Sequence, residues 1–419
     1  MSGTHMADGA YENVTATASG MDRALDAGEG IVRLAPAWVP RAFCTPGRRI
    51  RLHPDDYFPF EQGRGGVDER WLASAVRADN GPKTGEHEGL SLVVDPDGEA
   101  LLPFDEFVGH HKARLIGSRL WDGHGKWPMY SKFFDNQQAL PFHVHHTDEK
   151  AALVDKPGKP EAYYYSPHMN NHLGDQPISF LGFQAEVTKE QVKERLARFA
   201  DGGDNRITDL SLGYRTQLGT GWDIPAGVLH APASVCTYEP QAACDVFCMC
   251  ESWSNNREVP EDLLWKDVPE ANRGDLDFVI GLLEWDLNVD PYFVSNRFMR
   301  PYSTAQSAAD GETAYVEKWV VFRSSHFSAK ELTVRPGQTV TISDTDAYGT
   351  IVVQGHGTLG AHEVSAATLL RFGQLSQDEF FVSEEAATAG VRINNRSSTD
   401  DLVILKHFGP GNAELGLHA

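Results

Sequence analysis

Two histidines separated by one residue, His143 and His145, are the first candidates for chemistry in this sequence. They lie in a run typical of a β-strand, where alternate side chains point to the same face, so both imidazoles can bind one metal ion from one side. Glu161 and His230 follow on other β-like runs. Neutral imidazoles suit Zn, Mn, Fe, Co or Ni, and a carboxylate offsets part of the charge of a dication. The pattern predicts a metal centre with these four residues as ligands.

Chance grouping is the simplest alternative, because the chain contains 17 histidines. A lone His-x-His pair is more often solvated or part of a core than a metal ligand. Here the pair is combined with a glutamate on the next β-like run and with a histidine just after the turn at residues 225–227. His146 and Glu149 lie beside the pair, and either could replace a ligand or hydrogen-bond to one.

Short β-like runs must position these side chains. Residues 133–253 read mainly as strands, with one helix predicted over residues 188–200, where Thr188 is the capping residue and the apolar side chains share one face. Residues 303–313 are small and polar and predict a linker, after which β-rich runs return. Many short strands with Gly and Pro turns favour a sandwich or barrel over a parallel α/β sheet.

The expected organisation is therefore a mainly β protein with two jelly-roll β-barrels and helical insertions. Residues 1–30 are small and polar and predict a flexible tail. Residues 31–302 form the expected catalytic, metal-binding domain. Residues 314–419 form the expected second barrel, which lacks a His-x-His pair and for which we predict no metal. The Gly-x-Gly-x-x-Gly pattern at residues 355–360 has no helix after it and predicts a turn between strands.

Composition restricts the classes of function. The formal net charge is -22, and such a surface repels nucleic acid and anionic lipid. No window is apolar over the length that a membrane span needs, and no basic stretch followed by an apolar one marks a signal peptide. Five cysteines are too few for a disulfide scaffold, and Cys244, Cys248 and Cys250 are expected to be buried thiols. We expect a cytoplasmic protein with a small-molecule partner.

The segments around the ligand set resemble the cupin superfamily, and more closely the class I, zinc-dependent mannose-6-phosphate isomerases. Lys159–Glu161 reads Lys-Pro-Glu, and residues 225–231 read Pro-Ala-Gly-Val-Leu-His-Ala; both match motifs of that family unchanged. Glu69–Trp71 resembles its early Glu-x-Trp segment, Lys132 its early lysine, and Arg257 the end of its active-site arginine segment. The likeness covers about residues 31–260. It implies a carbohydrate substrate and one divalent metal, zinc in the first place.

One departure limits the resemblance. The family usually carries Gln where this chain has His143, and Pro where it has His146. The resulting set of three histidines and one glutamate is common among cupins of many activities. By resemblance, the reaction is an aldose–ketose isomerisation through an enediol. Lys159 would act in proton transfer, Arg257 would hold an anionic group or the enediolate, and Glu149 is a candidate base beside His146.

Two other functions remain open from the sequence. An iron-dependent cupin oxygenase could use the same ligands, and a cupin without catalytic activity could bind sugars. The Lys-Pro-Glu and Glu-x-Trp segments favour the isomerase. Phosphorylated and unphosphorylated sugars are equally compatible with the residues, and so is a homo-oligomer.

Overall fold

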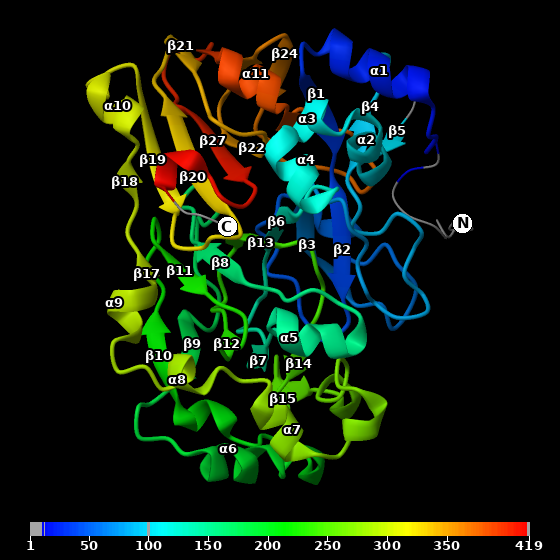
Figure 1. Ribbon diagram of the computed structural model, residues 1–419, viewed down its shortest axis with the longest axis vertical. Coiled ribbons are helices and arrows are strands. Elements are labelled where there is room, and N and C mark those ends of the chain that lie inside the picture. The colour runs from blue at the N-terminus through cyan, green and yellow to red at the C-terminus, as the bar shows by residue number, and fades with distance from the viewer. Residues whose placement is uncertain (1–10, 12, 99–100, 417–419) are drawn as a thin grey trace.

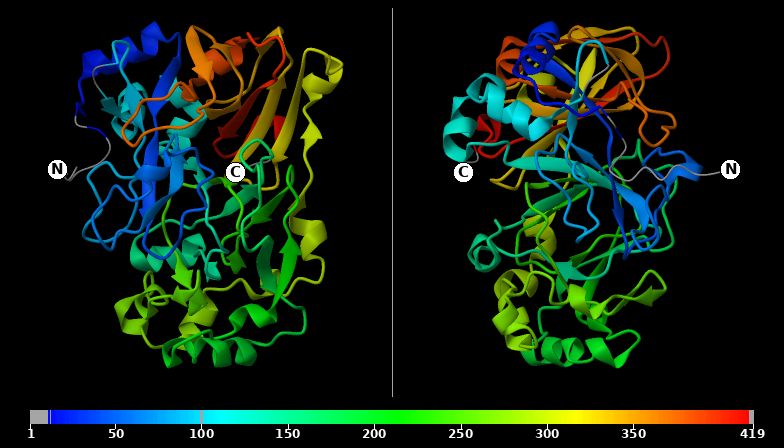
Figure 2. Two further views of the ribbon diagram at one scale, coloured as in Figure 1. Left: turned by 180° about the vertical axis from the view of Figure 1, so that it is seen from behind. Right: turned by 90° about the vertical axis from the view of Figure 1, so that its right-hand side faces the viewer.

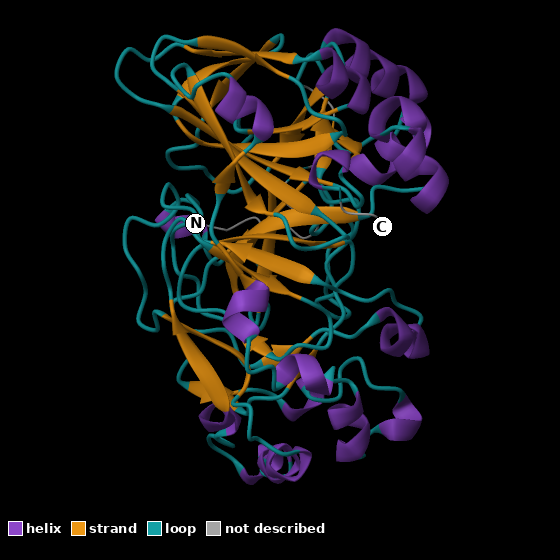
Figure 3. Ribbon diagram, turned by 60° about the vertical axis from the view of Figure 1, so that its left-hand side comes forward, coloured by secondary structure: helices purple, strands orange, loops and turns teal. Residues whose placement is uncertain are grey.

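Antiparallel β-sheets make up most of the computed structural model, which describes residues 11, 13–98 and 101–416. The mainly β prediction is therefore confirmed. Figure 1 shows two halves stacked along the long axis, and Figure 3 shows strands through the middle with helices towards the outside. None of the helices in the described part of the chain has the length and apolar character that crossing a membrane requires.

The lower half in Figure 1 holds the candidate metal ligands and is built from two sheets. One sheet has the order β17 (Phe298–Met299), β11 (Gly221–Ile224), β8 (Glu161–Tyr164), β13 (Thr237–Ala242), β6 (Met129–Phe134), β3 (Gly66–Leu72), β2 (Ala37–Arg41). The other has the order β10 (Ser211–Arg215), β9 (Ile178–Phe183), β12 (His230–Ala231), β7 (His143–Val144), β14 (Cys248–Met249). A short hairpin joins β15 (Trp253–Ser254) to β16 (Arg257–Glu258).

The upper half is also built from two sheets. The larger has the order β18 (Tyr302–Ser303), β19 (Tyr315–Val321), β20 (Ser328–Val334), β27 (Leu402–Phe408), β22 (Tyr348–Gln354), β25 (Glu379–Val382), β1 (Ile31–Ala35), β4 (Leu92–Val94), β5 (Leu101–Pro103). The smaller has the order β21 (Thr339–Ile342), β26 (Val391–Asn395), β23 (His356–Leu359), β24 (His362–Ser365). The glycine-rich segment at 355–360 lies at the turn into β23 and along it, so no dinucleotide-binding helix follows it.

Helices lie on the outside of both halves (Figure 3). Those of the upper half are α1 (Ala18–Ala27), α2 (Phe104–His111), α3 (Ala113–Ile116), α4 (Ser118–His124), α10 (Ala305–Ala309) and α11 (Glu384–Ala389). Those of the lower half are α5 (Asp148–Ala151), α6 (Lys189–Leu196), α7 (Leu276–Gly281), α8 (Trp285–Asn288) and α9 (Phe293–Arg297). The predicted helix at 188–200 corresponds to α6, whose N-terminus carries a full capping box formed by Thr188 and Gln191.

Two expectations about chain organisation are corrected. The segment predicted as a flexible tail contains α1, whose Met21, Ala24 and Leu25 are buried in the main core. The segment predicted as a linker contains α10, which is capped by Thr304. In α1, polar composition concealed apolar side chains on one face, whereas α10 buries only Ser307.

The expected domain boundary also differs from the observed one. Strand β1 pairs with β25, with Ile31 opposite Val382, so N-terminal residues complete the sheet of the C-terminal segment. Figure 2 shows the first and last parts of the chain side by side in the upper half. Buried Arg70 on β3 joins the halves through Asp378 and Glu379, with nitrogen–oxygen distances of 2.7 and 3.1 Å. Pairing between distant segments leaves no local signal in the sequence. The sheets built from described residues do not close into barrels, so the two closed barrels remain a prediction.

Candidate metal centre

The four predicted ligands meet between the two sheets of the lower half. His143 opens β7, His145 follows just after it, and His230 on β12 pairs directly opposite His143. Glu161 opens β8 in the other sheet. The ligand nitrogens of the three histidines lie within 4.8 Å of one another, and all three rings are buried. Folding therefore brings residues from three distant segments to one point.

Backbone carbonyls orient all three imidazoles. Nδ1 of His143, His145 and His230 lies 2.7 Å from the carbonyl oxygens of Pro141, Val246 and Val228, respectively. A carbonyl oxygen can only accept, so each Nδ1 carries the hydrogen and each Nε2 presents a lone pair. This arrangement is typical of metal-bound histidines, whose second nitrogen is usually held by a hydrogen bond.

The carboxylate of Glu161 faces these lone pairs. Its oxygens lie 2.9 Å from Nε2 of His145 and 3.1 Å from Nε2 of His230. Neither nitrogen carries a hydrogen for these contacts, and Nε2 of His230 is buried without a hydrogen-bond partner among the described residues. Tyr163 donates a hydrogen bond to Glu161 and orients it. Lone pairs and a negative charge thus converge on one point, and a divalent cation fits this donor set.

Positive charge is already present beside the donors. Nζ of Lys159 lies 2.9 Å from Nε2 of His145 and 3.1 Å from a carboxylate oxygen of Glu161. Burial opposes ionisation of Glu161, but its neighbours, Lys159 foremost, outweigh burial and hold its pKa well below the ordinary value. Burial, reinforced by Lys159, lowers the pKa of His145 to about 3. Near neutral pH, the imidazole is therefore neutral and the carboxylate is charged, as metal binding requires.

A second wall of charged side chains faces the donor set across a cavity of about 30 Å³. Lys132 on β6 lies 3.3 Å from Glu69 on β3 and 3.2 Å from Glu239 on β13. Burial and the neighbouring Glu161 raise the pKa of Glu239 to about 8. Lys159 approaches Glu239 to 4.0 Å. The cavity therefore holds a carboxyl group that can exchange a proton near neutral pH.

A larger cleft of about 690 Å³ adjoins this cavity, and Arg41, Phe43 and Phe247 line both. Arg257 lies in the cleft, where its guanidinium donates to the carbonyl of Cys44 at 2.7 Å. Arg273 is a second exposed arginine of the cleft. Neither has a carboxylate partner in the part of the chain that the structure describes. The cleft thus offers free positive charge beside the metal centre.

Two predicted residues do not reach the site. Glu149 lies on α5, where its side chain is 84% exposed and pairs only with the neighbouring Lys150 among the described residues. Thr147 caps α5 and turns the chain towards solvent directly after the ligand pair. His146 is buried but points away, with Nε2 against the carbonyl of Asp267 at 3.0 Å. Glu149 is therefore wrong as a base, and His146 is outside the ligand set.

Glu239 was not singled out from the sequence, although a signal exists. Strand β13 is buried and carries Thr237, Glu239 and Gln241 at alternate positions, a polar face that an ordinary core strand lacks. The pattern shows only that three polar side chains share a face. The partners of Glu239 come from elsewhere in the chain: Lys132 from β6 and Lys159 from the loop before β8.

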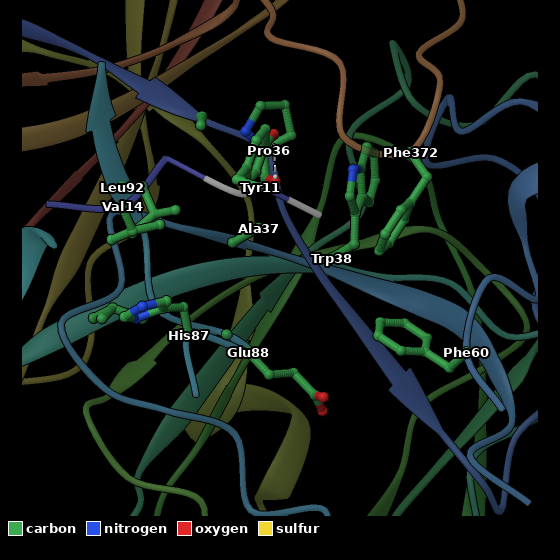
Figure 4. Close-up of a pocket in the computed structure, with 13 residues that line it drawn as sticks. Tyr11, Val14, Pro36, Ala37, Trp38, Phe60, His87, Glu88, Leu92 and Phe372 are labelled. Atoms are coloured by element: carbon green, nitrogen blue, oxygen red, sulfur yellow. Dashed lines mark hydrogen bonds between the residues drawn. The ribbon is translucent and has the colours of Figure 1, made fainter. Parts of the chain in front are cut away.

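Other candidate clusters offer less. All five cysteines are buried and free, which confirms the expected burial of Cys244, Cys248 and Cys250. Asp22, His110 and His111 also lie close enough for a metal, but His110 already bonds to Asp22 at 2.9 Å and both are partly exposed. Figure 4 shows an aromatic pocket of about 30 Å³ in which Trp38, Phe60 and Phe372 lie near one another. It lies outside the metal centre.

Comparison with solved structures identifies the fold of this chain. The mannose 6-phosphate isomerase from Bacillus subtilis is 15% identical and matches 90% of this chain and 99% of its own, with a TM-score of 0.59. The chain shares the fold of the mannose-6-phosphate isomerases. A variant of the phosphomannose isomerase from Salmonella typhimurium and a zinc-bound mannose 6-phosphate isomerase are each 11% identical, with a TM-score of 0.60 and coverage of 91% of this chain and 100% of theirs. No family model and no curated protein matches the sequence.

Proposed function

We propose that this protein is a metal-dependent aldose–ketose isomerase that acts on a sugar phosphate and uses zinc. One observation carries the proposal: three Nε2 lone pairs and a carboxylate face a wall of buried ionisable groups across a single small cavity. The donors suit a divalent cation, and the wall suits proton transfer. The fold shared with mannose-6-phosphate isomerases is consistent with this chemistry.

The metal would be held by His143, His145, Glu161 and His230. A bound divalent cation supplies positive charge that polarises the sugar oxygens and stabilises an enediolate. The carbonyl contacts of the imidazoles fix this donor set before the substrate arrives, so little reorganisation is needed.

Glu239 is the best-placed group for moving the proton between carbons. Its pKa of about 8 allows it to accept a proton in one step and return it in the next. Lys132, 3.2 Å away, supports its charged form. Lys159 would donate to a sugar oxygen that develops negative charge. These roles replace the base that the sequence suggested in Glu149.

The cleft supports a phosphorylated substrate over an unphosphorylated one. Arg257 and Arg273 line it without carboxylate partners among the described residues, and Lys266 lies across the ring of Phe247 at 4.2 Å. Free guanidinium groups bind phosphate oxygens through two parallel hydrogen bonds. This local cluster opposes the overall charge of -22, so it can hold an anion that the rest of the surface repels.

Proton transfer distinguishes this proposal from the two alternatives. An oxygenase or a sugar-binding cupin without catalytic activity needs no carboxyl group with a pKa near neutrality beside the metal. The zinc-loaded protein is incubated in deuterated water with a panel of aldose phosphates and their unphosphorylated forms, and NMR follows isomerisation and exchange at carbon 2. We expect both for at least one phosphorylated sugar. Absence of exchange across the panel contradicts the proposal, and oxygen uptake with Fe(II) would favour the oxygenase.

A further inference from the structure

A second polar cavity of about 330 Å³ lies between the two halves of the molecule. Asp223 on β11 pairs with Ala162, whereas Glu161 pairs with Ile224, so Asp223 lies on the face of the ladder opposite to the metal ligand. The loop between β19 and β20, at residues 322–327, closes the cavity from the upper half, and Arg297 at the end of α9 completes it. The cavity is therefore separate from the metal centre, but its Asp223 lies on β11, the strand that pairs with β8, where Glu161 lies.

Basic side chains and two carboxylates line this cavity together. Arg297 pairs with buried Asp223 at 2.8 Å, and the carboxylate of Asp148 accepts the amide hydrogen of Gly158 at 2.7 Å. Arg323 and His326 also line the cavity, and neither side chain has a carboxylate partner in the described ranges. Burial raises the pKa of Asp223, and Arg297, Arg323 and His326 oppose that rise, so all three basic groups lie near its carboxyl group.

Hydroxyl groups add neutral donors. Ser324 and Ser325 line the cavity beside the basic side chains. The oxygen of Ser324 accepts the amide hydrogen of His326 at 3.2 Å, which leaves the hydroxyl hydrogen of Ser324 free to donate. Guanidinium groups, an imidazole and hydroxyls around one cavity form the donor set that binds tetrahedral oxyanions.

We propose that this cavity binds a phosphate dianion, free or as a monoester, and that the bound anion steadies the loops that carry the metal site. Gly158 and Pro160 line the cavity and flank Lys159, whose side chain points to the donors on the other face. Pro225 and Ala226 line it too, and the next residue, Gly227, donates its amide hydrogen to the carbonyl of His145 at 2.7 Å. An anion in the cavity therefore contacts both segments that hold the metal site.

Titration calorimetry with inorganic phosphate tests the site on zinc-loaded protein from which excess zinc has been removed. Arg323→Gln removes an unpaired charge of the cavity, Arg257→Ala a charge of the cleft, and Arg198→Gln an exposed charge on the distant lower end near α6. We expect saturable binding that Arg323→Gln weakens at least about tenfold, while the other two variants keep it. Absence of saturable binding, equal binding by Arg323→Gln, or complete loss in Arg257→Ala overturns the proposal.

Two further measurements complete the test. Glycerol 3-phosphate in place of inorganic phosphate shows whether the cavity accepts a monoester: competition with phosphate that depends on Arg323 supports the monoester, and its absence restricts the site to free phosphate. Amide hydrogen exchange at residues 156–161 should slow on addition of phosphate in the wild type and not in Arg323→Gln. If phosphate leaves amide hydrogen exchange at residues 156–161 unchanged in both proteins, the proposed steadying of this loop by the anion is overturned. This site stands on its own cavity, so its failure and that of the isomerase proposal are independent.

Discussion

Replacement of Glu239 by Gln tests the proposed proton transfer. The amide has the shape of the carboxyl group and keeps an oxygen that can accept from Lys132, which retains Glu69 as its partner at 3.3 Å. The change removes the group whose pKa is raised to about 8 and leaves the metal donors in place. We therefore expect the variant to fold and to bind metal like the wild type.

The expected loss follows from the role of the group. General acid–base catalysis contributes about 10²- to 10⁴-fold to a rate, which corresponds to roughly 3–5.5 kcal/mol of activation free energy. The pH profile supplies a second signature. A bound cation lowers the pKa of a nearby carboxyl group. The wild-type kcat should therefore rise with pH and then level off, with an apparent pKa between about 4.5, the ordinary glutamate value, and about 8, the raised value of Glu239. The variant should lack this limb.

The assay is isomerisation of the best phosphorylated sugar of the panel, measured from pH 5 to 9 on metal-loaded protein. Thr237→Val is the matched control, because Thr237 lies on the same face of β13 and is equally buried. The control should keep kcat within a few-fold. A kcat of Glu239→Gln within tenfold of the wild type, or an unchanged pH limb, refutes the assignment of Glu239. Loss of metal from Glu239→Gln would refute the assignment of proton transfer to Glu239 and of metal binding to the four donors alone.

Further predictions concern the cleft, the donor set and a buried histidine of the upper half. Arg257→Ala should raise KM for a phosphorylated sugar at least about tenfold and change KM for its unphosphorylated form much less; equal effects on both contradict phosphate binding by Arg257. Tyr163→Phe removes a hydrogen bond to Glu161 and should weaken zinc affinity about 10- to 100-fold, measured by competition with a chelator; unchanged affinity contradicts the orienting role. Burial lowers the pKa of His407 to about 3, whereas the unfolded imidazole binds a proton below about 6.5, so this residue should cost about 2 kcal/mol of stability between pH 7 and pH 5. Urea unfolding of His407→Gln should show a pH dependence smaller by that amount, and an unchanged dependence contradicts the linkage.

Local patterns predicted which side chains the fold brings together at the candidate metal centre. His143 and His145 share a face because a strand alternates its side chains, and the structure brings them together with His230 and Glu161. Helix α6 was predictable because its cap and its apolar face are both encoded within a dozen residues. These features depend on neighbours in sequence, which is the range over which periodicity and capping act.

Long-range contacts explain what the sequence left open. Glu149 follows the ligand pair closely, but the cap of α5 turns it into solvent, and proximity in sequence was misleading. Glu239 acquires its raised pKa from burial near Glu161, a residue of another strand. The pairing of β1 with β25 joins residues about 350 positions apart and moves the domain boundary. Strand pairing across such a distance is decided by the whole fold.

Metal content tests the central claim most directly. Protein purified without chelators is analysed by inductively coupled plasma mass spectrometry for the wild type, His145→Ala, Glu161→Gln and, as a matched control, His146→Ala, whose side chain is buried but points away from the donors. Circular dichroism confirms that each variant is folded. We predict one equivalent of a divalent transition metal, zinc in the first place, in the wild type and the control, and a clear loss in the two ligand variants. A wild type without stoichiometric metal, or ligand variants that retain it, would contradict the account.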